Sequence, residues 1–317
     1  MRLGSWKSQR ATINSQLFFG LFEHRRFGLN RYHGKHAVAC FAGIAPDMCT
    51  VRNSMNVRLL PAVLFISLAA PTVLAQSPEE KGLQIAQEAD SRGEGFGDFQ
   101  ADMKMVLISK SGQTSERELR VKTLEGTGEG EGDKSLTIFD TPRDVRGTAM
   151  LTFSYKTRDD DQWLYLPALR RVKTIASRNK SGPFMGSEFS FEDMRGQEVE
   201  KYTYEYLRDE PCGELTCFVV ARYPQDEDSG YIRQVSWIDQ QEYRTWKVDY
   251  YDRKESLLKT LKASDFSQYQ DKYWQPGKMS MVNHQTGKST DLFWSNYRYG
   301  TGLDGADFNK NSLKRAR

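Results

Sequence analysis

The stretch "FQADMKMVLIS", residues 99–109, alternates apolar and polar side chains with a period of two. In an extended chain this spacing puts Phe99, Met103 and Met105 on one face and the polar residues between them on the other. The pattern therefore predicts a strand with one buried face and one solvated face.

The next stretch, "ERELRVKTL" (residues 116–124), repeats the alternation, with Leu119 and Val121 on its apolar face. Similar segments follow at 134–140, 148–156, 161–167, 170–176, 198–208, 215–223, 231–239, 243–252, 256–264, 272–283 and 289–298. Short strands separated by turn signals indicate antiparallel meanders. A sheet of more than about ten strands rarely stays flat. We therefore predict a mainly β fold, a strongly curved antiparallel sheet around a hydrophobic concavity.

The N-terminal part of the chain has the features of a leader. "MNVRLLPAVLFISLAAPTVLAQS", residues 55–77, has a basic start, an apolar run and small residues at its end, which predicts a signal peptide at 55–75 cleaved after Ala75. The alternative is a membrane anchor, but the run is shorter than the ~20 residues that a spanning helix needs. Residues 1–54 lack periodicity and are interpreted as an over-extended, unstructured N-terminus. Residues 76–317 are predicted to form a single domain.

Removal of this leader changes the charge and the reactive residues of the chain. Residues 1–75 hold nine of the 45 basic and two of the 42 acidic residues, so 36 and 40 remain and the net charge is −4. This acidic balance gives nucleic-acid binding no electrostatic support. His284 is then the one remaining histidine, and Cys212 and Cys217 are the remaining cysteines. In an oxidising compartment these two are expected to form a disulfide; a redox-active pair is the alternative, although their spacing differs from the thioredoxin motif.

The segment "SPEEKGLQIAQEADSRG", residues 77–93, predicts a helix. Ser77 is a candidate N-cap, Pro78 stands at the first helical position, and Glu80 completes a capping box. A modest apolar stripe follows at helical spacing: Leu83, Ala86 and Ala89. Gly93 is the expected stop, and the stripe should lie on an apolar surface.

The glycine-bounded segment "GPFMGSEFSFEDM", residues 182–194, concentrates Phe and Met in an expected loop. One interpretation is a flap whose Phe184, Met185, Phe189 and Phe191 side chains point into the concave face and move when a ligand enters. The alternative is a fixed core plug. Met elsewhere on the apolar faces favours a cavity for varied apolar ligands, because its side chain adapts to irregular space.

The candidate ligand-binding residues are Phe99, Met103, Met105, Leu119, Val121, Phe153, Trp163, Tyr165, Phe184, Met185, Phe189 and Phe191. Ordinary core packing is the alternative for each aromatic residue. Basic residues gather beside the glycine-bounded segment: Arg170, Arg171, Lys173, Arg178 and Lys180. This basic rim could meet phosphate groups, anionic lipid head groups or an acidic partner, or it could be a solvated strand face.

The remaining polar motifs favour structural roles over catalysis. His284 lies beside a turn without the partners of a catalytic triad. The run Asp159–Asp161 lacks the glycine and distal glutamate of an EF-hand and is interpreted as a solvated turn. The carboxylates Glu188, Glu192 and Asp193 could form an acid–base pair. We interpret them instead as partners of the nearby cations Arg178, Lys180 and Arg195 that pin the segment. No metal site and no cofactor are expected.

Several long blocks occur together: "EGDKSLTIFDTPRDVRGTAMLTF" (131–153), "DDDQWLYLPALRRVKTIASRNKSGPFMGSEFSFEDM" (159–194), "VNHQTGKST" (282–290) and "NSLKRAR" (311–317). Through these blocks the chain resembles outer-membrane lipoprotein-sorting proteins, distant relatives of the periplasmic lipoprotein carrier LolA, over nearly all of residues 85–317. The resemblance implies an unclosed β-barrel of the LolA/LolB type, covered by helices, that binds lipid acyl chains or similar apolar cargo. It also makes a membrane transporter of the resistance-nodulation-division (RND) type a plausible partner.

Together these features predict a periplasmic, monomeric, non-enzymatic carrier or chaperone that binds lipid acyl chains or lipoprotein in a hydrophobic cavity. The alternative is a periplasmic accessory subunit that docks to and regulates an RND-type transporter. Nucleic acid is not expected as a partner.

Overall fold

The structure is a computed structural model that describes residues 76–315; the predicted leader regions 1–54 and 55–75 lie outside the described residues. Within 76–315, helix α1 (Pro78–Ser91) comes first, thirteen strands follow in one sheet, and helix α2 (Lys310–Arg315) comes last. The strands are β1 (Asp98–Ile108), β2 (Thr114–Leu124), β3 (Glu131–Thr141), β4 (Ala149–Tyr155), β5 (Asp161–Leu166), β6 (Arg171–Ile175), β7 (Tyr202–Cys212), β8 (Leu215–Pro224), β9 (Tyr231–Asp239), β10 (Thr245–Asp252), β11 (Leu257–Tyr269), β12 (Tyr273–Asn283) and β13 (Ser289–Tyr299).

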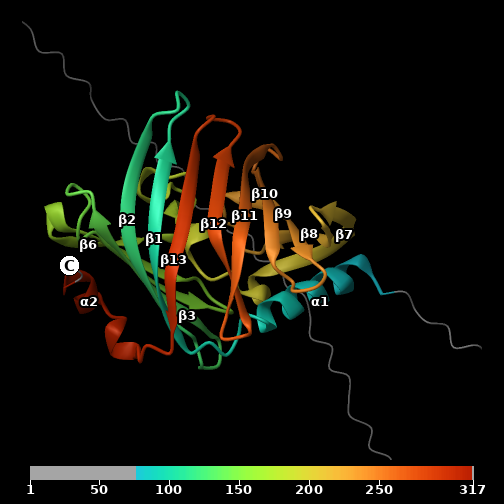
Figure 1. Cartoon of the computed structure of the whole chain (residues 1–317), viewed down its shortest axis with the longest axis horizontal. Coiled ribbons are helices and arrows are strands. Elements are labelled where there is room, and N and C mark those ends of the chain that lie inside the picture. The colour runs from blue at the N-terminus through green and yellow to red at the C-terminus, as the bar shows by residue number, and fades with distance from the viewer. Residues whose placement is uncertain (1–75, 316–317) are drawn as a thin grey trace, which may run out of the picture. The chain divides into compact units, whose positions relative to one another are not determined.

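Neighbouring strands run antiparallel in the order β6-β5-β4-β3-β2-β1-β13-β12-β11-β10-β9-β8-β7. Strand β1 lies in the middle, because it pairs with both β2 and β13. Strands β6 and β7 form two free edges, so the sheet is curved but not closed (Figure 1). The predicted mainly β fold, a curved and unclosed antiparallel sheet with covering helices, is confirmed.

One face of the sheet, which we call the inner face, carries the largest core. Cross-strand partners share a face, and the pairs Met103–Trp294 and Met105–Leu292 join β1 to β13 on this one. Met105 is fully buried. Because apolar residues of strands far apart in sequence meet here, the inner face holds the two halves of the sheet together.

Helix α1 packs on this face beside β7. Its predicted capping box is confirmed: Ser77 Oγ accepts from Glu80 N, and Ser77 N donates to Glu80 Oε2, both at 3.2 Å. A Cβ on Gly82 would lie 2.7 Å from Tyr206 N. The glycine therefore permits a helix-to-strand approach that any side chain would block.

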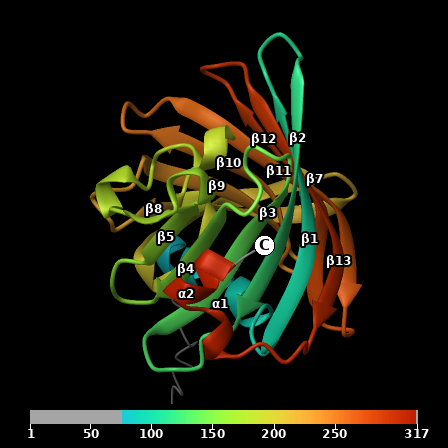
Figure 2. The same ribbon diagram turned by 90° about the vertical axis from the view of Figure 1, so that its left-hand side faces the viewer.

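Helix α2 covers the opposite, outer face of β4 and β5 (Figure 2). Leu313 and the preceding Phe308 are buried there against Leu151 and Trp163. Part of the sheet is consequently buried on both faces, and its strands carry apolar residues without strict alternation.

The strand prediction differs from the structure mainly at β11, which continues five residues past the predicted end at 264 to Tyr269, and at β7. A 3-10 turn at Val199–Lys201 occupies the start of the predicted strand 198–208, and β7 extends four residues further to Cys212.

The predicted disulfide is confirmed: Cys212 and Cys217 are bonded, with 5.8 Å between their Cα atoms, across the turn between β7 and β8. None of the helices within residues 76–315 combines the length and the apolar character needed to cross a bilayer.

Candidate functional site

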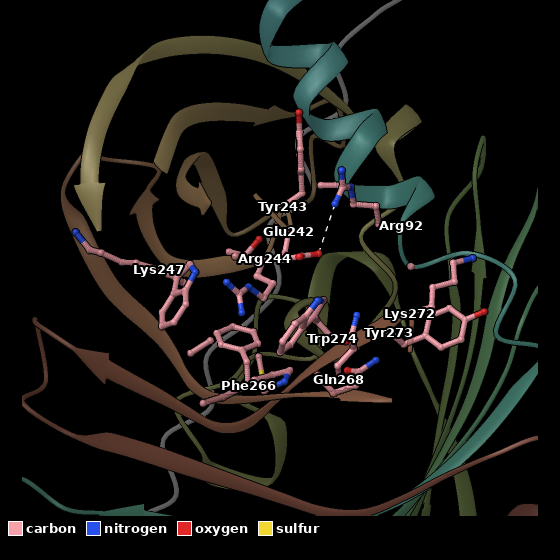
Figure 3. A pocket seen from close by; sticks show the side chains of 18 of the residues that line it. Arg92, Glu242, Tyr243, Arg244, Lys247, Phe266, Gln268, Lys272, Tyr273 and Trp274 are labelled. Atoms are coloured by element: carbon pink, nitrogen blue, oxygen red, sulfur yellow. Dashed lines mark ion pairs between the residues drawn. The ribbon is translucent and has the colours of Figure 1, made fainter. Parts of the chain in front are cut away.

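A cavity of about 470 Å³ lies against the inner face of β10, β11 and β12, where the C-terminal end of α1 borders it (Figure 3). Its aromatic wall consists of Tyr243, Trp246, Phe266, Tyr273 and Trp274. Its aliphatic lining includes Val248, Leu261, Ala263 and Met279. Pockets of roughly 300–1,000 Å³ with mostly apolar walls are typical of small-molecule sites. This cavity is the candidate functional site.

In the middle of β11, the side chains that face the cavity change from odd-numbered to even-numbered residues, and this change brings Phe266 into the aromatic wall. Before Asp265 the odd-numbered Ala263 lines the cavity, whereas after it the even-numbered Phe266 does so. Asp265 has a φ of +57°, a left-handed conformation that breaks the two-residue alternation. A Cβ on the facing residue Gly277 would lie 2.8 Å from Asp265 O, so glycine leaves room for this kink.

Arg244 places a positive charge against the aromatic wall. Its side chain is 13% exposed, and its guanidinium lies 4.6 Å from the ring centroid of Trp274 and 5.5 Å from that of Phe266. Figure 3 shows the guanidinium directed between these rings. Cation–π contacts of this kind hold an arginine in an otherwise apolar wall.

Asp239, at the end of β9, holds the Nε end of the Arg244 guanidinium in place. Its Oδ2 accepts from Arg244 Nε at 2.8 Å and from Trp246 Nε1 at 3.0 Å, and its Oδ1 accepts from Glu242 N at 2.7 Å. Burial acts to raise the pKa of Asp239, but these hydrogen bonds outweigh it and lower the pKa below its ordinary value. The carboxylate therefore stays ionised and orients the arginine.

Polar contacts at the cavity edge connect α1 to the turns of the sheet. Arg92 Nη1 donates to Gln241 O at 3.1 Å and lies 3.7 Å from Glu242 Oε2. Lys272 Nζ donates to Glu94 O at 2.5 Å. These contacts are exposed, so each contributes little to stability. The C-terminal end of α1 is therefore held at the cavity edge by weak polar contacts.

The predicted ligand-binding residues of the first two strands lie in the main core, outside this cavity. Met103, Met105, Leu119 and Val121 are buried on the inner face, with no more than 7% exposure. Phe99 lies nearer the cavity: its ring neighbours Tyr299 at 5.5 Å, which in turn stacks on the cavity residue Tyr273. Ligand contact by these residues stays a prediction.

The glycine-bounded segment packs into the same core. Phe184 is fully buried, Phe189 is 3% exposed, and Met185 and Phe191 lie against them. The Phe184 ring neighbours Phe139 at 5.8 Å and Phe191 at 5.7 Å. This is the arrangement of the core plug that the sequence left open, and we call residues 182–194 the plug segment.

The carboxylates of the plug segment pin it to the sheet. Glu192 interacts with the predicted cations Arg195 and Lys180 and accepts from Gly230 N at 3.2 Å, whereas Asp193 and Glu188 have other partners. Asp193 pairs with Lys259 Nζ at 2.5 Å and accepts from Tyr231 OH at 2.9 Å. Glu188 accepts from Asn283 Nδ2 at 2.7 Å. The predicted partners were cations close in sequence, but the partners of Asp193 and Glu188 come from β9, β11 and β12 because the segment folds back onto the sheet.

Three predicted cavity residues face away from the inner face, which corrects the sequence interpretation. Phe153, Trp163 and Tyr165 belong to the core beneath α2 on the outer face. Their neighbours Met150 and Leu164 face the inner core instead. Both faces of β4 and β5 are apolar, so alternation could not tell which side faces a ligand.

The predicted basic rim is divided by the structure. Arg170, Arg171 and Lys173 are exposed at the edge strand β6, and Arg178 lines a separate, more polar cavity beside the plug segment. Lys180 is not a rim residue: its side chain is 6% exposed and pairs with Asp226. None of the five predicted rim residues lines the β10–β12 cavity.

The other polar candidates have structural partners. Asp160 was predicted in a solvated turn, but its side chain is 2% exposed and pairs with Arg195 at 2.9 Å and with Lys201. His284 Nε2 lies 2.8 Å from Thr260 Oγ1. Among residues 76–315, no cluster of three or more His, Cys, Asp or Glu side chains is arranged to hold a metal ion.

Sequence reasoning missed the residues that line the β10–β12 cavity, Arg244 among them. The available signal was the density of aromatic residues in "YRTW" (243–246) and "YWQP" (273–276). Neither stretch was among the candidate ligand-binding residues. The kink at Asp265, which turns Phe266 toward the cavity, has no counterpart in the alternation.

Comparisons with known proteins place this geometry among related chains. The profile of a family described as "-like: Uncharacterized protein" matches residues 131–315. No curated protein sequence matches the chain.

Among solved structures, an outer membrane lipoprotein-sorting protein domain from Vibrio parahaemolyticus is 56% identical, with a TM-score of 0.73 over 75% of this chain and 100% of that chain. A DUF1329 family protein from Desulfovibrio piger is 30% identical, with a TM-score of 0.71 over 75% and 100% of the two chains. A LolA superfamily protein from Nitrosomonas europaea is 19% identical, with a TM-score of 0.60 over 73% and 99%, and shares the fold.

Proposed function

The chain belongs to the family of the outer-membrane lipoprotein-sorting domain and the DUF1329 protein, and from this membership and its LolA-like fold we propose that it is a non-enzymatic carrier for lipid acyl chains or lipoprotein. The observation that carries the proposal is the apolar cavity of about 470 Å³ between α1 and strands β10–β12. The cargo chain lies along the aromatic wall, and the end of α1 covers it.

The energetics of an acyl chain require such a cavity. Each buried methylene contributes roughly 0.8 kcal/mol, so a chain of ~14 carbons resists entry into water by about 11 kcal/mol. A carrier offsets most of this cost with an apolar lining. The exposed contacts of Arg92 and Lys272 at the cavity edge are weak enough to break and reform as cargo enters and leaves.

We also infer that the protein is exported to the periplasm as a monomer, with the mature chain starting after Ala75. The confirmed Cys212–Cys217 disulfide supports an oxidising compartment. N-terminal sequencing of the exported protein tests the cleavage site, and a mature N-terminus upstream of Met55 would contradict it.

The carrier proposal is tested by extracting lipids from the purified protein and identifying them by mass spectrometry. The variant Ala263→Phe places a ring in the cavity wall, whereas Val282→Phe on the same hairpin adds a ring at a residue that is 42% exposed. We expect stoichiometric acyl lipid with the wild-type and Val282→Phe proteins and loss of lipid with Ala263→Phe. Lipid-free wild-type protein that also fails to take up added acyl lipid would refute the proposal.

A second candidate is an accessory subunit that docks to an RND-type transporter. One feature favours it: edge strand β6 presents Arg171 and Lys173 to solvent next to Leu169, which is 53% exposed. Unpaired strand edges are sites for adding a partner strand. Lipid-free protein that cross-links to such a transporter, and loses the cross-link on charge reversal at Arg171 and Lys173, would favour this candidate over the carrier.

A further inference from the structure

We propose that the β10–β12 cavity selects amphiphiles with an anionic head group, a carboxylate or a phosphate, and that the two terminal amino groups of Arg244 bind this group. The inference rests on the proposed carrier function and deepens it, because it assigns a polar end to the cargo. Its basis is the juxtaposition of a fixed guanidinium with an apolar cavity.

The hydrogen bonds of Arg244 leave one side of its guanidinium unused. Asp239 takes the Nε–H, at 2.8 Å. Within residues 76–315, the two terminal amino groups of Arg244 have no hydrogen-bond acceptor, although the side chain is only 13% exposed. These amino groups are not among the buried side-chain atoms without a partner, so they reach the open part of the cavity, where a ligand oxygen can accept from them.

Asp239 does not supply the missing acceptor. Besides the donors already described, it accepts from Gln241 N at 3.1 Å and from Arg244 N at 3.2 Å. Five donors thus occupy a carboxylate with about four lone-pair sites. The remaining capacity of Arg244 is therefore directed away from Asp239, toward the cavity.

The surroundings of Arg244 favour an anion. The indole of Trp274 lies 4.6 Å from the guanidinium, and Trp274 Nε1 is buried without a hydrogen-bond partner, which places a second unused donor in the wall. Two other cations of the lining already have carboxylate partners, because Arg92 pairs with Glu88 and Glu242, and Lys247 pairs with Asp249. A planar guanidinium binds carboxylate and phosphate through paired hydrogen bonds, and low polarity nearby strengthens them.

The test compares three amphiphiles that share a twelve-carbon chain: dodecanoate, dodecyl phosphate and uncharged monolauroylglycerol. Each is titrated below its micelle concentration into the wild-type protein, and binding is followed by calorimetry and by tryptophan fluorescence, to which the cavity residues Trp246 and Trp274 contribute. We expect dodecanoate or dodecyl phosphate to bind about 10- to 100-fold more tightly than the neutral compound, the range of one charge-assisted contact. The stronger of the two anions identifies the head-group class.

Two variants locate the selectivity. Arg244→Met should remove the preference for anions, so that the three amphiphiles bind with similar affinity. Arg208→Met is the matched control, because Arg208 pairs with Glu210 on the surface of β7 and is 55% exposed; it should change neither affinity. If Arg244→Met does not fold, Arg244→Lys, which keeps the charge, should retain a reduced preference in the same titrations.

The outcomes separate the two proposals. Equal binding of all three amphiphiles by the wild-type protein, or an anion preference that survives in Arg244→Met, would overturn the head-group inference while the carrier function stands. Failure of all three to bind, with no lipid on the purified protein, would overturn the carrier function itself.

Discussion

Replacing Phe184 by alanine should lower the free energy of unfolding by about 3–5 kcal/mol, the range for removing a fully buried phenylalanine. Phe184 has no exposed surface, and its ring contacts those of Phe139 and Phe191 at 5.8 and 5.7 Å. Loss of the ring removes its burial, worth roughly 1.5–3 kcal/mol, and leaves a void in the centre of the core. For a domain of this size the expected fall in Tm is roughly 6–20 °C.

Urea unfolding followed by tryptophan fluorescence measures the effect, and the same preparations are analysed for bound lipid. Phe293→Ala is the matched control: it removes the same ring from a residue on β13 that is 38% exposed, and should cost about 1 kcal/mol or less. We expect Phe184→Ala to retain lipid at low temperature, because the candidate cavity lies at β10–β12. A loss below 1 kcal/mol together with loss of lipid would refute the core-plug interpretation in favour of a movable flap.

Two further predictions concern buried charge. Burial, together with the charges of Asp133 and Asp90, raises the pKa of Glu198 to about 7, and burial raises that of Asp133 to about 6. These carboxyls hold protons more tightly in the folded than in the unfolded chain, so the free energy of unfolding should fall as pH rises from about 4 to about 7, and Glu198→Gln should flatten this decline. Lys259→Met should destabilise the domain by about 3–5 kcal/mol because it leaves Asp193 buried and unpaired, and the double variant with Asp193→Asn should recover part of the loss.

Urea titrations across the pH range check the first of these predictions; an unchanged slope in Glu198→Gln would show that this carboxyl titrates normally in the folded state. The double-variant cycle checks the second. Losses that simply add for Lys259→Met and Asp193→Asn would mean that the 2.5 Å contact contributes no coupling between the plug segment and β11.

Local patterns in the sequence were enough for the elements of the fold. The alternation at Met103 and Met105 predicted a strand because side-chain direction in an extended chain has a fixed period of two. The capping box at Ser77 and Glu80 predicted the start of α1 because those contacts lie within one helical turn. The Cys212–Cys217 pairing followed from compartment and proximity in sequence.

The candidate site depended on contacts that the local pattern does not contain. Alternation shows that a residue faces the opposite side from its neighbour, but not what covers that side. Trp163 was therefore assigned to a cavity, although α2 buries it on the outer face. The plug segment was likewise visible as an apolar cluster, but its partners Lys259 and Asn283 come from strands far along the chain.

The sequence by itself determined a curved antiparallel sheet with one apolar face and a helix to lie on it, because periodicity and caps act over a few residues. Only the tertiary structure decided where that face stays unfilled. The plug segment fills the inner face around Phe184, whereas the left-handed kink at Asp265 and the fixed Arg244 shape the space beside α1. Whether side chains fill a concave surface depends on which distant segments fold onto it. The total volume of those side chains cannot be derived from a local sequence pattern.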